Sequence, residues 1–289
     1  MIEKFVNLAE KIEEIITENL EFRGMAGIKL QNQLINTAVE LNNSKVIVIV
    51  TGFYIHKAGI GETDGPLGAL SMANTLSRLD KEVVILTDEY TSKFIEIGID
   101  LLGIDVNLYV VTVESAKMAC DGILSKHKPD HVIAIERPGK SASGKYHSMS
   151  GEDLTDYIPD LDYMFEIAKI NGIRTSAIGD GGNEIGMGKI KDYIISRVPL
   201  GEKIASVTET DNLIIAGVSN WGGHGVSAMI SALNDKDVMY DENVEYKLLD
   251  AMVSAGAVDG CTKKAERSVD GFSLDINMDI IKRLRELVK

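Results

Sequence analysis

The chain has 289 residues, a formal net charge of -14 and only two cysteines. This length allows a large core, while the acidic balance, without clustered Lys and Arg, argues against nucleic acid as a partner. No apolar stretch is longer than a strand, and residues 1–20 are acidic and amphipathic, so we expect no membrane span, no secretion signal or transit peptide, and a cytoplasmic location.

Six apolar runs predict the strands of a sheet. They are continuous in Val, Ile and Leu, as in strands that are covered on both faces, and helix-like segments alternate with them. The alternation predicts an α/β fold: a mostly parallel sheet of about six or more strands with helices on both faces, in a Rossmann-like, three-layer arrangement. In chain order, the predicted strands are residues 46–50, 83–86, 108–111, 132–135, 173–178 and 213–218, and the predicted helices are residues 67–79, 92–102, 115–127, 160–171 and 224–233.

The whole chain, 1–289, is interpreted as a single domain, with 241–289 as a candidate C-terminal appendage. Residues 241–255 and 278–288 have helical patterns, and two Val-Asp-Gly turns lie between them. These turns have three interpretations: a hairpin, a pocket wall or a dimer surface. Association of identical chains is left open.

The first polar cluster follows the first predicted strand. Thr51 and Gly52 begin a connection that is long for a strand-to-helix loop, and Glu62 and Asp64 stand just before Pro66. The structural interpretation of Asp64 is an N-terminal helix cap, which is worth about 1 kcal/mol. A cap does not explain Glu62 or the length of the loop, so this segment is a candidate lid or ligand wall.

The second cluster, Glu136 and Arg137, ends the fourth predicted strand, and His147 follows in a loop rich in Ser, Gly and Lys. The structural interpretation is an internal ion pair between Glu136 and Arg137. The functional interpretation is that Arg137 grips a ligand carboxylate through two nitrogens, while His147 titrates near neutral pH.

The third cluster is the Gly-rich turn after the fifth predicted strand. The backbone N–H groups of Gly181, Gly182 and Asn183 can point at an anion, while Asp180 and Glu184 can bind a cation or move a proton. Asn183 is also a candidate cap for a short helix that follows it. The structural alternative is a turn that is kept only for its geometry.

The fourth cluster, at the end of the sixth predicted strand, contains Asn220, Trp221, Gly222 and His224. We expect His224 at the start of the next helix, where the helix dipole disfavours its charged form. That position makes His224 a second acid/base candidate.

The carboxyl ends of parallel strands meet at one edge of the sheet. We therefore expect the four clusters to form one site, with Asp64, Arg137, Asp180 and Trp221 around a single pocket. A ligand carboxylate would then contact backbone N–H groups in the turn at residues 179–182.

Taken together, these motifs resemble the D-glutamate cyclases, which interconvert D-glutamate and 5-oxo-D-proline. The resemblance covers nearly the whole chain in one order, and its most specific part is residues 179–188. It implies an enzyme of the lyase class, of the hydro-lyase type, whose partner is a small amino-acid substrate. The segments that carry it are Arg23-Gly24-Met25, Thr51-Gly52-Phe53, Glu62-Thr63-Asp64-Gly65-Pro66-Leu67-Gly68-Ala69, Glu136-Arg137-Pro138-Gly139, Tyr146-His147, the Gly-rich string 179–188, Ser219-Asn220-Trp221-Gly222, Ala257-Val258-Asp259-Gly260 and Ser268-Val269-Asp270-Gly271.

Lactam formation needs a base near the α-amine, cationic groups or strong donors on the γ-carboxylate, and stabilisation of a tetrahedral oxyanion. No cofactor is identified by spacing, but a divalent metal, Mn²⁺ or Mg²⁺, held by Asp64 and Asp180 would supply the same positive charge. The catalytic candidates are Glu62, Asp64, Glu136, Arg137, His147, Asp180, Glu184 and His224. The substrate-binding candidates are Thr51, Gly52, Gly181, Gly182, Asn183, Asn220, Trp221 and Gly222.

The rival hypothesis is a metal-assisted binder or hydrolase of a phosphorylated metabolite, with residues 179–188 as the phosphate cradle. The chain lacks the Lys-Ser/Thr pair of a P-loop and the spaced glycines of a dinucleotide site. A third hypothesis is a non-catalytic, metabolite-sensing protein that has kept the pocket.

Overall fold

The computed structural model describes residues 2–289 and contains a six-stranded, wholly parallel sheet. Ile49 in the central strand pairs with Ile85 on one side and Ile133 on the other. In spatial order the strands are β5 (Asn107–Val111), β4 (Glu82–Asp88), β1 (Val46–Thr51), β6 (His131–Ile135), β7 (Arg174–Gly179) and β8 (Asn212–Ile215). All six match the predicted strands, which confirms the parallel sheet.

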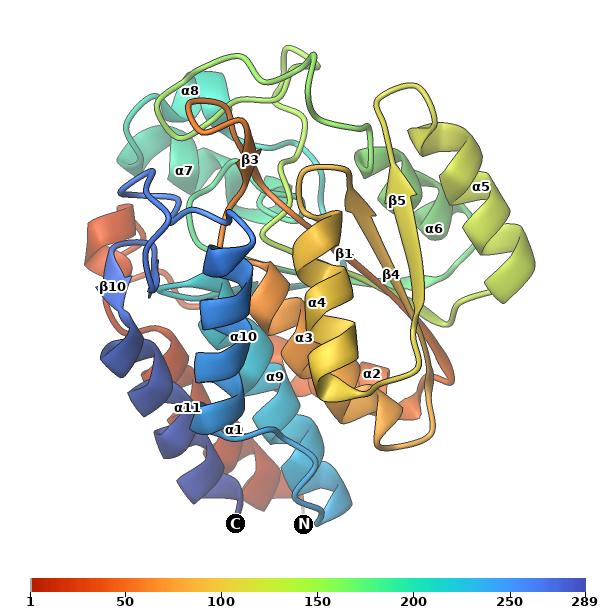
Figure 1. The fold of residues 1–289 in the computed structure, drawn as a ribbon, viewed down its shortest axis with the longest axis vertical. Helices are drawn as coiled ribbons and strands as arrows, with labels where there is room; N and C mark the ends of the chain where they lie inside the picture. Colours follow the sequence, from red (N-terminus) through yellow and green to blue (C-terminus); the bar gives the residue numbers. More distant parts are fainter. Residues whose placement is uncertain (1) are drawn as a thin grey trace.

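Helices cover both faces of this sheet, so the three-layer prediction is also confirmed (Figure 1). Alternate residues of β1 show why: Ile47 and Ile49 pack into one core, and Val48 and Val50 pack into the other. The first core is formed with α1 (Ile2–Ile16), α2 (Gln33–Asn43), α3 (Pro66–Ser77), α4 (Ser92–Leu102), α9 (Ser219–Asn234), α10 (Glu242–Ser254) and α11 (Leu274–Val288). The second is formed with α5 (Ala116–His127), α6 (Asp162–Ile170), α7 (Lys191–Arg197) and α8 (Gly201–Ile204).

The order of the strands reverses between β1 and β6. From β1 the chain adds β4 and then β5 on one side, and afterwards β6, β7 and β8 on the other. At such a reversal the connections leave toward opposite faces of the sheet, which opens a crevice at the carboxyl ends of the strands. The fold therefore predicts a ligand site where β1, β6 and β7 end.

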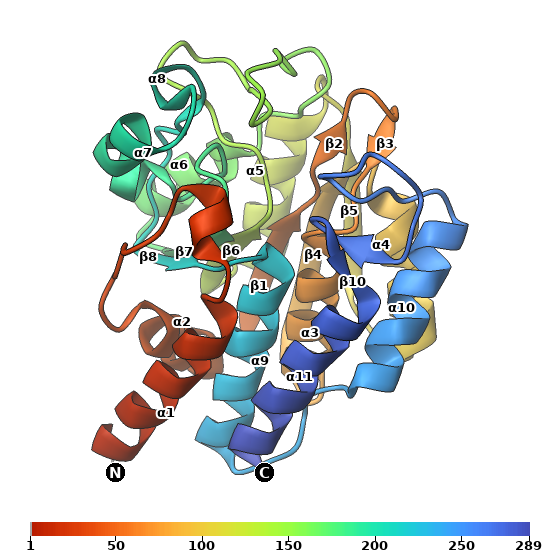
Figure 2. The same cartoon turned by 90° about the vertical axis from the view of Figure 1, so that its left-hand side faces the viewer.

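The C-terminal part of the chain packs on the same core as the N-terminal helix. Figure 2 shows α11 lying between α9 and α10, and α1 packs against both α9 and α11. The turns before α11 form the β9 (Ser268–Val269) and β10 (Phe272–Ser273) hairpin. The interpretation of residues 241–289 as an appendage stays a prediction.

Two predicted helix starts are wrong. The helix α9 begins at Ser219, five residues before His224, because Gly68 of α3 and Gly223 of α9 let the two backbones touch: a Cβ on Gly223 would lie 2.7 Å from the Gly68 Cα. Tight helix packing here outweighs the low helix propensity of glycine. Asn183 caps nothing, since the next helical turn, η2, is Gly188–Ile190.

A short helical turn, η1 (Leu20–Arg23), and a small hairpin, β2 (Tyr54–Ile55) with β3 (Ile60–Gly61), complete the elements near the carboxyl ends of the strands. Within residues 2–289, no helix is both long enough and apolar enough to cross a bilayer.

Candidate active site

Three carboxylates from three connections meet at the crevice. Asp64 follows β1, Glu136 follows β6 and Asp180 follows β7, and each contributes one oxygen to a group in which all oxygens lie within 4.8 Å of one another. All three residues are buried. We call Asp64, Glu136 and Asp180 the acidic triad.

Asp64 is fixed by the start of a distant helix. Its carboxylate accepts hydrogen bonds from the backbone N–H of Ser219 (3.0 Å) and Asn220 (2.8 Å), the first two residues of α9. The positive end of that helix dipole favours the negative charge. The structural interpretation of Asp64, a cap on the helix that begins at Pro66, is not supported, because Gly65 is the N-cap of that helix, with φ 94° and no side-chain cap bond.

Glu136 is held in an uncommon backbone conformation. Its φ of 43° lies in the left-handed region, which is rare for a residue with a side chain and recurs at functional sites. Its Oε2 accepts a hydrogen bond of 2.6 Å from the Ser219 hydroxyl. The same residue, Ser219, therefore positions both Asp64 and Glu136.

The backbone N–H groups of the Gly-rich turn bind a carboxylate, which belongs to Glu184 of the same turn. Glu184 accepts hydrogen bonds from the backbone N–H groups of Asp180 (3.1 Å), Gly181 (2.6 Å) and Gly182 (2.5 Å). This corrects the prediction that Gly181 and Gly182 point free N–H groups at a ligand. The side-chain amide of Asn183 likewise donates a hydrogen bond to the backbone oxygen of His147, at 2.7 Å.

Arg23 joins the acidic triad from the N-terminal side. Its Nη2 lies 2.8 Å from the Asp180 Oδ2, without the angular geometry of a hydrogen bond, and also pairs with Asp270. Burial alone would lower the pKa of the Arg23 guanidinium, but the charges of Asp180 and Asp270 outweigh burial and raise it. Arg23 stays protonated.

The carboxyl groups of this region resist ionisation. Burial raises the pKa of Glu136 well above its ordinary value, and Asp180 and Glu184 raise it further. Burial also raises the pKa of Asp64 and of Glu62, in both cases with Asp270 as the next contributor. For Asp180, burial raises the pKa and Arg23 opposes it. Such groups retain protons at a pH where exposed carboxyls have lost them, which suits acid/base work.

Two members of the triad, Glu136 and Asp180, line a small pocket of about 140 Å³, whereas Asp64 does not line it. This volume is well below the roughly 300–1,000 Å³ of sites for drug-sized ligands, so the pocket suits a small metabolite. Its mouth is formed by the β2–β3 hairpin and by residues 148–154, and its far wall by the loop before α11. The charged or titratable lining residues are Arg23, His56, Lys57, Glu62, Glu136, Glu152, Asp180, Glu184, Cys261, Lys263 and Asp270.

The donor set of the triad fits a hard divalent cation. Carboxylate oxygens are the ligands that Mg²⁺ and Mn²⁺ prefer. Asp180 Oδ2 is buried and accepts no hydrogen bond within the described chain, and Arg23 Nη2 lies 2.8 Å from it, so a metal ion would share this oxygen with Arg23. Asp64 and Asp180 were the predicted metal ligands, and the structure adds Glu136 as the third oxygen donor.

Arg137 lies outside the pocket. Its side chain is fully buried and donates to the Gly52 oxygen (3.0 Å) and the Pro159 oxygen (3.1 Å), and it forms an ion pair with Asp88. The predicted grip of Arg137 on a substrate carboxylate is therefore not supported, and its partner is Asp88 rather than the adjacent Glu136. The backbone oxygen of Gly52 serves Arg137 instead of a ligand.

The residues after β8 build the scaffold instead of lining the pocket. Trp221 is fully buried and donates from its indole N–H to Asn277 at 2.8 Å. Asn220 holds the start of α3, and Gly222 packs so closely on Ile178 that a side chain would clash. The expectation that these residues contact substrate is corrected: they belong to the scaffold, in which the backbone N–H of Asn220 holds Asp64. Thr51 is likewise buried and does not line the pocket.

Both histidine candidates lie away from the triad. His224 is buried inside α9, where its Nε2 lies 3.3 Å from Glu245 of α10, so it is not at a helix start. His147 is buried next to the pocket mouth, bridged to Asp153, and does not line the pocket. Burial lowers the pKa of His147.

Several pocket residues escaped the sequence-based site prediction, and those that matter most for the pocket wall are Arg23, Lys263 and Asp270. They lie outside the strand ends, where we expected the chemistry. The signal that points to Arg23 and Asp270 is that both lie in motifs that carry the family resemblance. Glu62, which was predicted, does line the pocket, and its carboxylate packs against Gly260.

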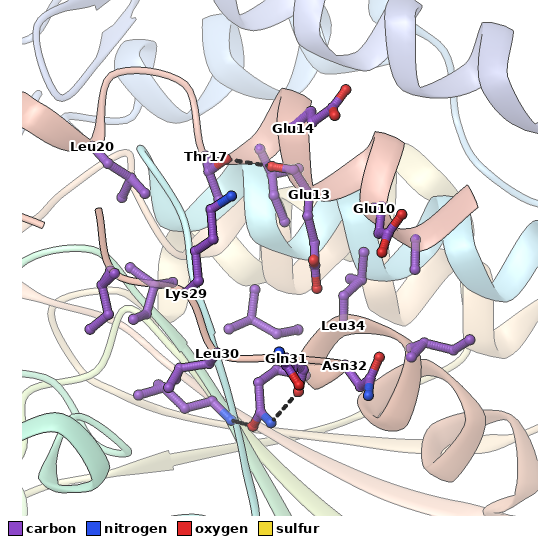
Figure 3. A pocket seen from close by; sticks show the side chains of 18 of the residues that line it. Glu10, Glu13, Glu14, Thr17, Leu20, Lys29, Leu30, Gln31, Asn32 and Leu34 are labelled. Atoms are coloured by element: carbon purple, nitrogen blue, oxygen red, sulfur yellow. Dashed lines mark hydrogen bonds between the residues drawn. The ribbon is translucent and has the colours of Figure 1, made fainter. Parts of the chain in front are cut away.

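A larger cavity, of about 870 Å³, lies elsewhere, between α1 and the segment at residues 26–35. Figure 3 shows Glu10, Glu13 and Glu14 of α1 on one side of it and Lys29 on the other. None of the acidic triad lines this cavity, so its size alone does not make it the candidate active site.

The comparisons with known proteins agree with the motifs. The family described as D-glutamate cyclase-like, C-terminal, matches residues 12–285. The chain is 32% identical over 225 residues to the human protein named D-glutamate cyclase, mitochondrial; the match covers 73% of this chain and 36% of that protein, so this chain spans about a third of the relative's length.

Among solved structures, a variant of actinorhodin polyketide ketoreductase with NADPH matches 86% of this chain and 91% of its own, at 11% identity and a TM-score of 0.34. A similarity of that size carries no argument about the site. The family match spans the triad and the whole pocket wall. The chain therefore belongs to the D-glutamate cyclase-like, C-terminal family.

Proposed function

We propose that the pocket beside the acidic triad interconverts D-glutamate and 5-oxo-D-proline. The observation that carries the proposal is the meeting of Asp64, Glu136 and Asp180 at the carboxyl edge of the sheet, in a chain that belongs to this family. The small volume of the pocket agrees with a substrate of this size.

The reaction joins the α-nitrogen to the γ-carbon of D-glutamate. The ammonium group gives up two protons, and one γ-carboxylate oxygen takes them and leaves as water, so the net charge of the substrate is conserved. A group that exchanges protons near neutral pH must therefore stand close to the nitrogen and to the departing oxygen.

Glu136 is our candidate for this proton transfer. Burial raises its pKa, the Ser219 hydroxyl holds one of its oxygens, and its strained backbone aims the carboxyl group at the other two members of the triad. Asp64 is held by two backbone N–H groups, so it completes the triad at a fixed position.

Asp64, Glu136 and Asp180 are also the residues that would hold a divalent metal. When bound, Mn²⁺ or Mg²⁺ would supply the positive charge that makes the γ-carboxylate a better electrophile. Glu62, buried beside Gly260, adds a further carboxyl group to the same wall.

The alternative of a phosphorylated substrate loses its main support. The N–H groups of Gly181 and Gly182, which would form the phosphate cradle, are taken by Glu184. A metabolite-sensing role would keep binding and lack turnover, so the assay below also tests it.

Partner and location remain proposals. We propose a small amino-acid substrate as the partner, no role for nucleic acid or membrane, and a cytoplasmic location, while association of identical chains stays open. The human relative's name contains the word mitochondrial, so its location differs from the one we propose for this chain.

The experiment is to incubate the purified protein with D-glutamate, L-glutamate, or either enantiomer of 5-oxoproline, with and without Mn²⁺ or Mg²⁺, and to follow both compounds by NMR. The proposal predicts interconversion of the D-compounds. Binding of 5-oxo-D-proline without turnover would favour the sensor, and phosphate release from a metabolite panel would favour the rival hydrolase.

A further inference from the structure

We infer that Arg23 binds a carboxylate of the substrate and that Asp270, from the opposite end of the chain, is the positioning residue that holds Arg23 in place. The inference rests on the proposed function for the substrate class, an amino dicarboxylate. Its evidence is the geometry of the pocket wall.

Arg23 lines the pocket, and one nitrogen of its guanidinium group, Nη1, is not engaged by other residues of the described chain. Its side chain is 15% exposed, its Nη2 pairs with both Asp180 and Asp270, and its Nε donates to the Gly217 oxygen at 3.4 Å. No hydrogen bond or ion pair within residues 2–289 uses Nη1. Arg23 lines the pocket, so this nitrogen is available to a ligand.

Asp270 owes its place to a tight turn. It has φ 53° and Gly271 has φ 81°, as in the Asp-Gly turns of two-residue hairpins, and the two residues join β9 to β10. Asp259 locks the loop around this turn by accepting from the Ser268 hydroxyl (2.6 Å) and the Gly271 N–H (2.7 Å). The turn therefore delivers the Asp270 carboxylate to Arg23 from a rigid frame.

The charge of the pocket explains why an anchor is needed. Its inner wall carries carboxyl groups on Glu62, Glu136, Asp180, Glu184 and Asp270, none of which offers a positive charge to an incoming dicarboxylate. The lining cations are Arg23, Lys263 and the exposed Lys57, and the ammonium group of Lys263 already donates to the Gly260 oxygen. A guanidinium has five N–H donors in a fixed plane, so Arg23 can keep both aspartates and still bind a ligand carboxylate.

The test measures binding of glutarate and of 5-oxo-D-proline by calorimetry. Glutarate has both carboxylates of glutamate and no amine, so its affinity does not depend on turnover. We expect Arg23→Gln to weaken binding by about tenfold to a hundredfold, the scale for loss of a charge-assisted hydrogen bond. Arg267→Gln is the matched control, because Arg267 lies three residues before Asp270 but is exposed and pairs with Asp250.

Asp270→Asn tests the positioning role. We expect it to raise the Kd for glutarate and the KM for substrate while changing kcat by no more than about threefold. In the double variant Arg23→Gln with Asp270→Asn, the affinity for glutarate should equal that of Arg23→Gln alone, because Asp270 acts through Arg23.

The double variant also tests whether Arg23 binds the ligand or only neutralises the charge of Asp180 and Asp270. If Arg23 only offsets Asp180 and Asp270, removing one aspartate should restore glutarate binding, and that result would overturn the inference. Wild-type affinity in Arg23→Gln would overturn it as well. If Arg23→Gln does not fold, Arg23→Lys with a normal melting curve replaces it, and unchanged binding in that variant contradicts the need for a guanidinium that holds both aspartates and the ligand.

The two proposals can fail separately. If the wild type binds glutarate through Arg23 but turns over neither D-glutamate nor 5-oxo-D-proline, the proposed function fails and the anchor stands. If the wild type turns over D-glutamate and Arg23→Gln has the same KM, the anchor fails and the function stands.

Discussion

Asp64 and Asn220 cap each other's helices. The Asp64 carboxylate accepts the first N–H groups of α9, while the Asn220 side-chain oxygen accepts from Gly65 (2.9 Å) and Gly68 (2.8 Å) at the start of α3. Asn220 also donates to the Thr63 oxygen, at 3.0 Å. This exchange joins the first and last connections of the sheet and places one carboxylate of the triad.

We expect Asn220→Ala to lower the free energy of unfolding by about 1–3 kcal/mol, because it leaves the buried N–H groups of Gly65 and Gly68 without an acceptor. Turnover should fall too, since Asp64 loses its frame. Urea unfolding measures the first effect, with the exposed Asn243→Ala as control. Equal stability of the two variants would show that the exchange contributes nothing to folding.

Replacing Glu136 by an uncharged residue should raise the stability of the fold and lower turnover. The folded pKa of Glu136 lies above its ordinary value, so its contribution to stability is present at low pH and is lost as pH rises through the folded pKa. We therefore expect Glu136→Gln to gain stability relative to the wild type as pH rises from about 4 to 8, and to lose turnover by at least about a hundredfold.

Melting temperatures across that pH range, with the exposed Glu96→Gln as control, check the stability part. A stability difference between Glu136→Gln and the wild type that does not change with pH would mean that Glu136 ionises as an ordinary exposed carboxyl does.

Arg137 should prove structural. Replacing it with Met leaves the Asp88 carboxylate buried without its partner, and breaking a buried ion pair in this way costs about 3–5 kcal/mol. Adding Asp88→Asn should recover part of that loss. A stable Arg137→Met protein with weakened substrate binding would instead revive the substrate grip expected from the sequence.

His224→Gln should keep turnover within about threefold of the wild type, because His224 contacts Glu245 and not the triad. Chemical unfolding should show a loss of about 1 kcal/mol from the broken interaction. Loss of turnover with native stability would return His224 to the list of acid/base groups.

The sequence predicts the scaffold better than the site. Strands buried on both faces need continuous apolar runs, so β1, β6 and β7 are visible in the sequence, and with them the convergence of Asp64 and Asp180. The pattern after each strand does not say which polar side chain faces the ligand. Asp64 and Asn220 both fit a capping role, and only the packing of α3 on α9 shows which helix each one caps.

Arg137 and Arg23 show the same limit. An arginine at a strand end has the same sequence signature whether it binds substrate or a buried aspartate. Here the partner is Asp88 at the end of β4, which is separated from β6 by β1. Arg23 reaches Asp270 across most of the chain's length, so no local pattern connects them. The Glu184 carboxylate accepts hydrogen bonds from the backbone of its own turn. Such bonds depend on side-chain geometry, which the sequence pattern does not show.

The most direct test of the account is hydrolysis of 5-oxo-D-proline in ¹⁸O-labelled water, with the wild type and with Asp64→Asn, Glu136→Gln and Asp180→Asn. Mass spectrometry of the D-glutamate formed would show whether one labelled oxygen enters the γ-carboxylate, as opening of the lactam by water requires. We predict single labelling by the wild type and rates lower by at least about a hundredfold in each triad variant. No labelled D-glutamate from the wild type, or wild-type rates in folded triad variants, would contradict the assignment of this site.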